Sequence, residues 1–357
     1  MALDIPSYRL HNQFLSQTDF TEPEQVVAAL GAVQSQDYAG AKWALAQRLK
    51  DAPTDAAIEK AFHEGKILRT HVMRPTWHFV TPTDIRWMLD LTAPRVKIAM
   101  AHMDRQLGLD KSILKKSNAT LRKALQGDRQ LTRSELAPIL EKAGVPVEGY
   151  HLGQLMGHAE LDQVICSGGR QGKQFTYALL EERAPRAKSL EREAALVELT
   201  RRYFKSHGPA TLQDFVWWSG LTTTDARKGM EAVKSEFEQE TVADQLYWFS
   251  APTLTRSSSL SVYLLSNYDE YTVGYRDRSA IFDRSHLDKL SAFRESILTQ
   301  VIVINGQVSG TWKRTLKKKE VVMEFVPFTA LTKEQNQVVI TAAERYGNFL
   351  QLPVVLV

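Results

Sequence analysis

The stretch LTRSELAPILEKAG, residues 131–144, decides the predicted fold because it shows where a short helix begins and ends. Thr132 and Glu135 have the spacing of a capping box, in which each side chain accepts a hydrogen bond from the backbone N–H of the other residue. Gly144 is typical of the position just after a helix, where the chain turns away. The stretch therefore predicts a short, capped helix.

The residues that follow predict a second helix and a β-hairpin. A helix is expected from about residue 149 to residue 162, and strands are expected at 163–166 and 174–179. The turn between the strands, 167–173, is rich in glycine. The predicted order in this part of the chain is thus helix, helix, β-hairpin.

The same order is predicted on both sides of this unit. Before it, cap signals at Thr21 and Glu24 precede three predicted helices, at 26–33, 41–49 and 54–63. Two predicted strands follow within 66–80 and are separated by a break at Arg74-Pro75. After it, a capping box at Thr211 and Asp214 opens two helices and two strands, at 211–220, 223–237, around 240 and at 247–249. Glu181 to Arg192, a charged segment, is a plausible linker between the second and third copies.

Three such copies in tandem, roughly 70 to 100 residues apart, are the pattern of winged-helix units. From about residue 257 the pattern changes to alternating strands, and Asn305-Gly306 is a strong signal for a two-residue hairpin. We therefore predict an α+β protein with three tandem winged-helix units followed by a C-terminal β-rich, barrel-like domain. The first unit with its following helices is predicted at 1–108, the second unit at 109–185 and the third unit at 186–252. The β-rich domain is predicted at 253–357.

The composition is that of an ordinary folded protein, with 357 residues of which 24% are charged and 43% hydrophobic. A formal net charge of +4 is too small to indicate nucleic-acid binding without local basic clusters. Cys166 is the single cysteine, which excludes an internal disulfide and a zinc site built on several thiolates. The first residues carry no signal-peptide pattern, and no stretch approaches the ~18 apolar residues of a membrane span. We expect a cytoplasmic protein that does not associate with membranes.

Gln34-Ser35-Gln36-Asp37 follows the first predicted helix and lies between two glycines. Residues two apart in a continuous helix point about 200° apart, so both glutamines can serve one site only if the helix ends or distorts here. A carboxamide offers donors and acceptors that can hold a water molecule or the edge of a base. A solvated, polar helix end is the simpler interpretation of such a pair.

The run from Arg69 to His78 is dense in hydrogen-bond donors and aromatic residues, and it falls on a predicted wing. One interpretation places His71, Arg74 and His78 in a basic, partly aromatic cleft that faces a phosphate or a base. The other places Trp77 in the core with the histidines on the surface. A metal site on the two histidines is not expected, because no third ligand lies at a suitable spacing.

Two more clusters carry charge. Acids, aromatic residues and arginines gather between Tyr268 and Ser279, which is typical of an internal ion-pair network. Five basic residues lie between two predicted strands, where either a solvated hairpin or contact with backbone phosphates explains them. These five are Lys313, Arg314, Lys317, Lys318 and Lys319.

Taken in order, these segments resemble the bacterial winged-helix DNA glycosylases of the AlkZ/YcaQ type. The resemblance rests on stretches that span nearly the whole chain: 33–37 with 43–48, 69–78, 264–278 and 308–314. Members of this family are described as three tandem winged-helix units with a barrel-like domain, which agrees with the order predicted above.

The resemblance implies a DNA-repair enzyme that hydrolyses the N-glycosidic bond of N7-alkylated purines and, in some members, unhooks interstrand crosslinks. It implies that Gln34 and Gln36 are the catalytic pair of a Gln-x-Gln motif, with Ser35 at a position where the family prefers an aliphatic residue. Asp37, the nearest carboxylate, is a secondary candidate. The expected DNA-binding residues are Arg69, His71, Arg74, His78, Lys313, Arg314, Lys317, Lys318 and Lys319.

This chemistry suits glutamine. An N7-alkylated guanine already carries positive charge, so its departure needs little acid assistance. The carboxamide oxygens of Gln34 and Gln36 would place a water near C1′ and face the positive charge that develops on the sugar. We expect a monofunctional glycosylase that needs no metal or other cofactor, acts as a monomer, and has damaged double-stranded DNA as its partner.

Two alternatives remain open. A non-enzymatic winged-helix DNA-binding protein or regulator would use the same wings and basic residues without the glutamines. A small-molecule enzyme on a winged-helix scaffold is also possible, since fold does not fix function, and it would have a closed, apolar pocket.

Overall fold

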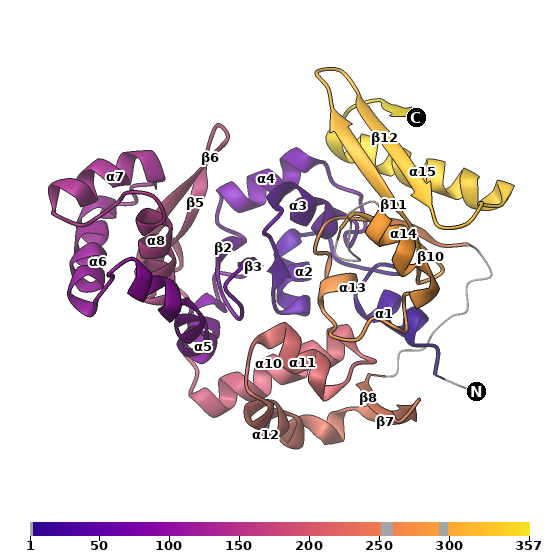
Figure 1. The fold of residues 1–357 in the computed structure, drawn as a ribbon, viewed down its shortest axis with the longest axis horizontal. Helices are drawn as coiled ribbons and strands as arrows, with labels where there is room; N and C mark the ends of the chain where they lie inside the picture. The colour runs from indigo at the N-terminus through magenta and orange to yellow at the C-terminus, as the bar shows by residue number, and fades with distance from the viewer. Residues whose placement is uncertain (1–2, 251–259, 293–298) are drawn as a thin grey trace.

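The computed structural model describes residues 3–250, 260–292 and 299–357, which form a mixed structure of helices and sheets (Figure 1). The predicted boundary at 252/253 lies outside the described residues. Three units of similar order are visible in Figure 1, the first in the centre, the second on the left and the third at the bottom, while the C-terminal sheet lies at the upper right.

The first unit is a three-stranded sheet with helices packed around it. Its elements are α2 (Pro23–Leu30), β1 (Val33–Gln34), α3 (Tyr38–Ala46), α4 (Asp55–His63), β2 (Leu68–His71) and β3 (Trp77–Val80). The first strand pairs with the last, so the order in the sheet is β1-β3-β2. The helix predicted for 26–33 ends earlier, at Leu30, because Gly31 has a φ of 85° that turns the chain into β1. Gln34 is therefore the last residue of a strand, and Gln36 follows that strand and not a helix.

The second unit repeats this topology. Its elements are α6 (Lys111–Leu125), β4 (Leu131–Thr132), α7 (Arg133–Lys142), α8 (His151–Leu161), β5 (Ile165–Gln171) and β6 (Gln174–Leu179), with the sheet order β4-β6-β5. The predicted capping box of Thr132 and Glu135 is present. The turn predicted for 167–173 is shorter, because β5 continues to Gln171 and pairs there with β6.

The third unit has the same order with a reduced sheet. Its elements are α10 (Arg192–His207), α11 (Leu212–Ser219), α12 (Thr223–Val233), the short 3-10 helix η1 (Lys234–Glu236), β7 (Glu238–Val242) and β8 (Gln245–Phe249). The capping box of Thr211 and Asp214 is present, as predicted. A single bridge between Ala210 and Trp248 takes the place of the first strand. One topology is thus repeated three times in the described part of the chain.

Three further helices connect and brace these units, and the sequence pattern did not predict their limits: α1 (Ile5–Asn12), α5 (Ile85–Gln106) and α9 (Leu180–Arg183). The long α5 contains Pro94 and packs against α8 and α10, so it joins the second unit to the third. Only part of the predicted linker at 181–192 is non-helical, because α9 covers its beginning.

The C-terminal part is an open five-stranded sheet. Its elements are β9 (Val262–Leu265), α13 (Glu270–Val273), η2 (Arg284–His286), α14 (Leu287–Ala292), β10 (Val301–Ile304), β11 (Gln307–Leu316), β12 (Val321–Pro327), α15 (Lys333–Leu350) and β13 (Val354–Leu356). The order is β13-β12-β11-β10-β9, with the first and last strands as unpaired edges. The prediction of a barrel-like domain is wrong for the described residues, because a barrel closes by pairing its edge strands.

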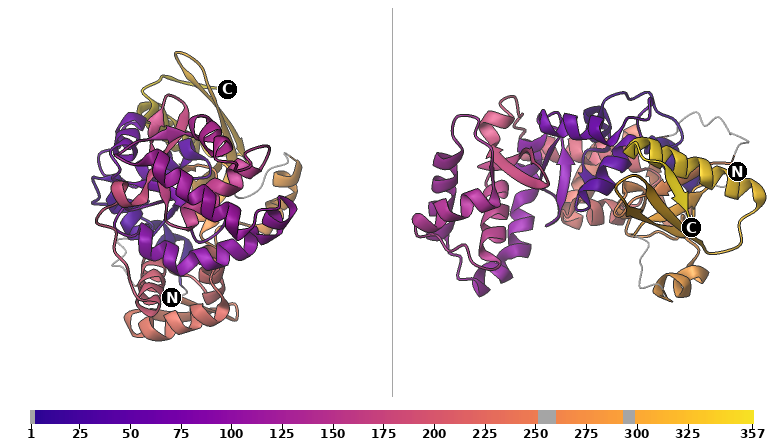
Figure 2. Two further views of the ribbon diagram at one scale, coloured as in Figure 1. Left: turned by 90° about the vertical axis from the view of Figure 1, so that its left-hand side faces the viewer. Right: turned by 90° about the horizontal axis from the view of Figure 1, so that it is seen from above.

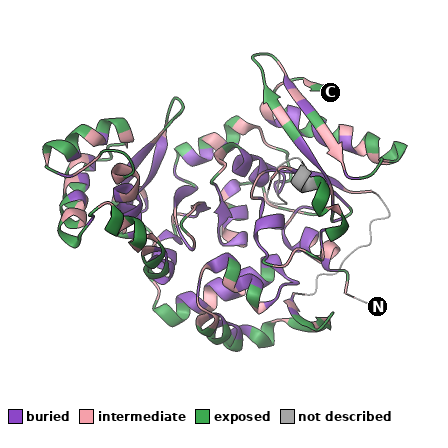
Figure 3. Cartoon of the chain, in the orientation of Figure 1, coloured by how far each residue is buried: buried purple, intermediate pink, exposed green. Residues whose placement is uncertain are grey.

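The hydrophobic cores join the units instead of separating them. One core cluster contains residues of both the first unit and the C-terminal sheet, and Trp43 packs there on Tyr346 and Phe349 at ring distances of 5.0 and 5.2 Å. A second cluster is shared between α5 and the third unit. Figure 3 shows buried residues running through these junctions, and Figure 2 shows the first unit between the second unit and the C-terminal sheet. The predicted domain limits remain predictions.

Candidate active site

Gln34 is held from two sides by residues that are distant in the sequence. Its backbone N–H donates to Oε1 of Glu270 at 2.8 Å, and its side-chain Oε1 accepts from Nη2 of Arg74 at 2.9 Å. Gln34 itself is only 6% exposed, because β1 lies against β3 in the sheet of the first unit. Both the backbone and the carboxamide of Gln34 are therefore fixed.

Gln36 differs from Gln34 in its exposure. Its side chain is exposed, and its Oε1 accepts a long hydrogen bond of 3.4 Å from the backbone N–H of Trp77. Gln34 is the last residue of β1, whereas Gln36 lies in a bend two residues further along the chain. The pair thus consists of one buried carboxamide and one that is open to solvent.

Asp37 has a structural role in this conformation. It is the N-cap of α3, where its Oδ1 accepts from the backbone N–H of Gly40 at 3.0 Å. Its Oδ2 accepts from Nδ2 of Asn267, also at 3.0 Å. The carboxylate of Asp37 therefore connects α3 to the C-terminal part and already has a partner at each oxygen.

Ser35, between the glutamines, is fully buried. Its backbone N–H donates to the carbonyl of Trp77 at 2.8 Å, and its carbonyl accepts from Nε of Arg69 at 3.2 Å. Its Oγ has no hydrogen-bond partner among the residues that the structure describes. The environment of this position is thus suited to a small apolar side chain.

Trp77 forms the centre of a basic and aromatic cluster beside Gln36. The guanidinium of Arg69 lies 4.3 Å from the Trp77 ring, and the imidazole of His71 lies 4.4 Å from it. Burial lowers the pKa of Arg69 to about 10, against the opposing effect of the Glu160 carboxylate. His71 is fixed in turn by Glu160, which lies 2.5 Å from its Nδ1 and also accepts from its backbone N–H. Trp77 is half-buried, so its ring is neither in the core nor fully at the surface.

His78 lies beneath the surface. It is fully buried, its Nδ1 lies 3.0 Å from the carbonyl of Thr76, and its Nε2 has no partner within the described ranges. Burial, reinforced by the charge of Arg74, lowers the pKa of His78 to about 3, so the ring is neutral. The structure brings His78 next to Gln34 in the sheet but does not bring its ring to the outer surface.

Arg74 bridges the first and third units. Besides its hydrogen bond to Gln34, its guanidinium lies 5.8 Å from the ring of Trp217 on α11. Burial lowers the pKa of Arg74, opposed by the nearby carboxylate of Glu270. Of the predicted cleft residues, Arg69, His71, Arg74 and His78 thus lie together around the glutamines, with different degrees of exposure.

Sequence reasoning did not include Glu270 among the site residues. Glu270 is 1% exposed, and its Oε2 accepts from Nε1 of Trp218 at 2.9 Å and lies 3.3 Å from Nε2 of His207. Burial alone would raise the pKa of this carboxyl, but the contacts with His207 and the N–H of Gln34 lower it to about 2. The available signal was its place in the acidic and aromatic cluster from Tyr268 to Ser279.

The neighbouring Asp269 forms a buried ion pair with Arg48, at 2.7 Å between Oδ1 and Nη2. Both side chains are almost inaccessible, at 0% and 1% exposure. This is the internal ion-pair network that the sequence suggested for the cluster. It joins α13 to the end of α3 and so helps to place the adjacent Glu270.

The predicted basic hairpin is formed by β11 and β12, which project at the top of the molecule (Figure 1). Lys313 is exposed, and Arg314 is half-buried, 5.3 Å from the ring of Tyr346. Burial lowers the pKa of Arg314, opposed by the charge of Asp37. The three lysines Lys317, Lys318 and Lys319 lie at the exposed hairpin turn, where the first is paired with Glu320 at 2.7 Å. Arg314 pairs with Met323 two residues before the end of β11, so it lies near the turn of the hairpin.

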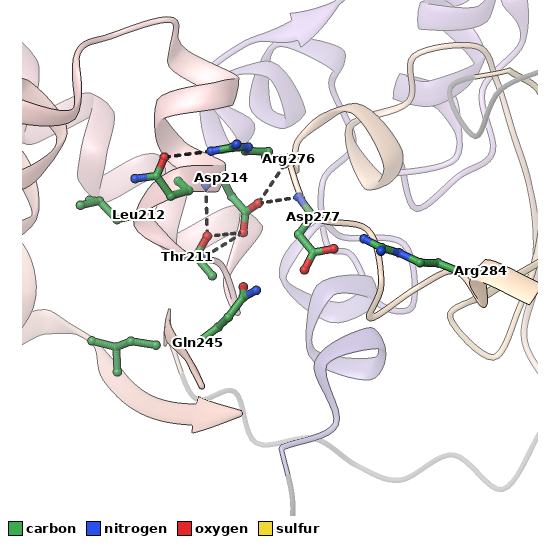
Figure 4. Close-up of a pocket in the computed structure, with 9 residues that line it drawn as sticks. Thr211, Leu212, Asp214, Gln245, Arg276, Asp277 and Arg284 are labelled. Carbon is green, nitrogen blue, oxygen red and sulfur yellow. Dashed lines mark hydrogen bonds between the residues drawn. The ribbon is translucent and has the colours of Figure 1, made fainter. Parts of the chain in front are cut away.

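A cavity of about 530 Å³ lies between the third unit and the C-terminal part. Figure 4 shows that polar and charged side chains line it, among them Asp214, Arg276 and Arg284. None of the candidate catalytic residues belongs to its lining. In the described residues, no group of three or more His, Cys, Asp or Glu side chains is placed to hold a metal ion. No described helix combines the length and the apolar composition needed to cross a bilayer.

Comparisons with known proteins agree with this architecture. The chain is 23% identical over 354 residues to a protein of Streptomyces sahachiroi named interstrand DNA cross-link repair glycosylase, with 92% of this chain and 93% of the relative covered. The solved structure of the Streptomyces sahachiroi DNA glycosylase AlkZ matches with a TM-score of 0.79 at 22% identity, covering 99% of this chain and 98% of the other. The model of the family described as DNA glycosylase AlkZ-like matches residues 27–349. This chain therefore belongs to the AlkZ-like DNA glycosylase family.

Proposed function

We propose that this protein hydrolyses the N-glycosidic bond of N7-alkylated purines in double-stranded DNA, and that Gln34 and Gln36 position the water. The observation that carries the proposal is the placement of the two carboxamides. Gln34 ends β1 and is fixed by Arg74, and Gln36, two residues further on, is exposed beside Trp77. Membership of the family supports the class of reaction, and the placement of Gln34 and Gln36 supports the choice of catalytic residues.

The carboxamides of Gln34 and Gln36 are suited to a substrate whose base leaves with little acid assistance. A carboxamide oxygen has two lone pairs, so Oε1 of Gln34 can accept from a water molecule while it keeps its hydrogen bond to Arg74. The exposed Gln36 can hold the same water from the solvent side. Both oxygens carry partial negative charge, which stabilises positive charge developing at C1′ without removing a proton in advance. The substrate base is cationic, so a strong general acid is not required.

The relative named for interstrand cross-link repair supports a wider substrate range. We infer that crosslinked N7-alkylpurines are substrates as well, because a site at an exposed surface does not require a bulky lesion to enter a closed pocket. Gln36 is exposed beside the half-buried ring of Trp77, which is consistent with an open site.

We further infer that the three repeated units are winged helices that hold the duplex. In each unit the chain returns from its hairpin to pair the last strand with the segment before the second helix, as in a winged helix. The proposed DNA contacts are Arg69, His71 and Arg74 around the glutamines, with His78 supporting them from beneath, and the hairpin residues Lys313, Arg314, Lys317, Lys318 and Lys319. Phosphate contacts of this kind position the duplex without reading its sequence.

The reaction is tested with a duplex that carries a single N7-methylguanine, with excess enzyme and an undamaged duplex as the control. We expect release of the free base, followed by strand cleavage only after treatment with hot alkali, since a monofunctional glycosylase leaves an intact sugar–phosphate strand. A second duplex with an N7-linked interstrand crosslink is expected to separate into single strands on a denaturing gel. Tight duplex binding with neither product would favour the non-enzymatic DNA-binding alternative.

The remaining parts of the proposal concern the oligomeric state, the location and the cofactor requirement of the enzyme. We propose that it acts as a monomer in the cytoplasm and without a metal or other cofactor. Sedimentation at the assay concentration tests the oligomeric state, with a mass near 40.4 kDa as the expected result. A chelator in the base-release assay tests the metal, and full activity is expected in its presence.

A further inference from the structure

We propose that Glu270 is a positioning residue for the reaction inferred above, on which this proposal rests: its carboxylate fixes Gln34 through the backbone N–H of Gln34. Glu270 lies at the start of α13, far from Gln34 in the sequence. It does not face solvent, so its role is exerted through Gln34.

The geometry of the contact is that of a strong hydrogen bond. The N–H of Gln34 lies 2.8 Å from Oε1 of Glu270, and neither residue is more than 6% exposed. Hydrogen bonds with a charged partner are shorter and stronger than neutral ones, and in a buried site they are not weakened by water. The position of the Gln34 backbone is therefore tied to the position of this carboxylate.

The other oxygen of Glu270 is occupied by the third unit. Nε1 of Trp218 on α11 donates to Oε2 at 2.9 Å, and Nε2 of His207 at the end of α10 lies 3.3 Å away. Trp218 and His207 are themselves fully buried, and their rings lie 5.2 Å apart. Glu270 therefore links the strand that carries Gln34 to the core of the third unit.

This role needs a carboxylate and not only a side chain of that size. A carboxylate accepts at both oxygens, whereas a carboxamide in its place has one acceptor and one donor. If glutamine replaces Glu270, its single side-chain oxygen can accept from either the N–H of Gln34 or Nε1 of Trp218. Its NH2 group then faces the other of these two donors. A buried donor that loses its acceptor is costly, so β1 or α11 must shift.

Arg74 completes the arrangement from the opposite side. It donates to Oε1 of the Gln34 side chain, while Glu270 holds the Gln34 backbone. The carboxamide thus has a fixed direction, with its oxygen toward Arg74. Positioning of this kind lowers the barrier by holding reacting groups in place before the reaction, and small displacements are costly.

The experiment compares Glu270→Gln with Asp84→Asn, a change of another buried carboxylate. Asp84 is a matched control, because it is also a buried carboxylate that accepts from a tryptophan Nε1, that of Trp87 at 2.9 Å, but it pairs with Arg202 and not with Gln34. Both variants are expected to lose stability, so rates are measured at a temperature at which both remain folded by circular dichroism. Glu270→Asp, which keeps the charge but is one methylene shorter, serves as a second variant if Glu270→Gln does not fold.

The measurement is the single-turnover rate of base release from the N7-methylguanine duplex, together with the Kd for that duplex. We expect Glu270→Gln to slow release by about tenfold or more without weakening binding, and Asp84→Asn to leave the rate unchanged. In a Gln34→Ala background Glu270→Gln is expected to cause no further slowing, because both changes remove the same contribution. The proposal would be overturned if Glu270→Gln slowed release equally in the wild-type and Gln34→Ala backgrounds. It would also be overturned if Glu270→Gln and the control variant released base at the same rate.

Amide hydrogen exchange at Gln34 gives a readout that does not depend on activity. We expect exchange of this N–H to be faster in Glu270→Gln than in the wild type and Asp84→Asn. Unchanged exchange would contradict the contact itself. Absence of base release by the wild type would refute the proposed function, whereas a normal rate in Glu270→Gln beside a strongly slowed Gln34→Ala would refute only the positioning role.

Discussion

Ser35 separates the two glutamines and is fully buried, with an Oγ that has no hydrogen-bond partner in the described part of the chain. A buried hydroxyl without a partner costs about 1–3 kcal/mol. We expect Ser35→Ala to raise the free energy of unfolding by up to about 1 kcal/mol, since it removes the hydroxyl and leaves the backbone hydrogen bonds intact. Urea unfolding measures this change. Clear destabilisation would show that the hydroxyl is hydrogen-bonded in solution.

His78 makes stability depend on pH. Burial holds its pKa at about 3 in the folded protein, compared with 6.5 when unfolded, so below pH 6.5 the unfolded chain binds a proton that the folded protein does not. Stability is therefore present above pH 6.5 and is lost as the pH falls toward 3, by about 1.4 kcal/mol per pH unit for this one group.

Urea unfolding between pH 7.5 and pH 5 tests this expectation with His78→Asn. The variant is expected to be less stable at neutral pH but to show a flatter pH dependence. His207 and His11 have pKa values shifted in the same direction, so the dependence does not vanish. The same slope in the variant and the wild type would show that His78 is protonated in the folded state.

At the level of single residues, the sequence predicted which side chains gather but not all of their roles. Gln34, Gln36, Arg69 and Arg74 do lie together, because β1, β2 and β3 are neighbours in one sheet. Glu270 could not be predicted as their partner, since it stands 236 residues from Gln34 and only the packing of α13 brings it there. Likewise, no local pattern distinguishes a buried histidine such as His78 from an exposed one.

Among the helices, α3 begins at Asp37, which gives this residue a testable structural role. Asp37→Ala removes the hydrogen bonds to Gly40 and Asn267, and a lost N-cap costs about 1 kcal/mol. Asp37→Asn keeps a capping oxygen, so we expect it to be nearly as stable as the wild type and to release base at the wild-type rate. Thermal unfolding and the base-release assay check the two expectations. A large loss of rate in Asp37→Asn at full stability would instead assign the carboxylate a catalytic role.

The β11–β12 hairpin offers a test of the proposed phosphate contacts. Lys318 and Lys319 are exposed at its turn, so replacing both with Ala is expected to leave folding unchanged. If each contacts a phosphate, the slope of log K against log salt for duplex binding falls in magnitude by about 1 per lysine removed. Lys234→Ala, an exposed lysine paired with Glu231 in the third unit, is the control and is expected to keep the slope. An unchanged slope in the hairpin variant would remove these lysines from the interface.

Local signals predicted the elements best where a cap or a turn defined them. The capping boxes at Thr132 and Thr211, and the turn at Asn305-Gly306, lie where the sequence placed them. The end of α2 was misplaced because apolar residues continue past Gly31 into a buried strand, and periodicity does not separate the two over so few residues. The open C-terminal sheet was predicted as barrel-like because alternation identifies strands but not how their edges pair.

For the whole molecule, the arrangement of the units depends on contacts that no local pattern contains. The ion pair between Arg48 and Asp269 and the packing of Trp43 on Tyr346 join the first unit to the C-terminal part. Glu270 in turn joins the C-terminal part to Trp218 in the third unit. The candidate site around Gln34 is therefore assembled from three regions of the chain, which is why the order of the units could be predicted but their shared cores could not.

The most direct test of the account is base release from a duplex with one N7-methylguanine, in the presence of a chelator, by the wild type and by the Gln34→Ala/Gln36→Ala double variant. Both proteins must be folded and must bind the duplex with similar affinity. We expect release by the wild type and loss of release in the double variant, since the two carboxamides are proposed to position the water. Release at the wild-type rate by the double variant would show that Gln34 and Gln36 are not the catalytic pair.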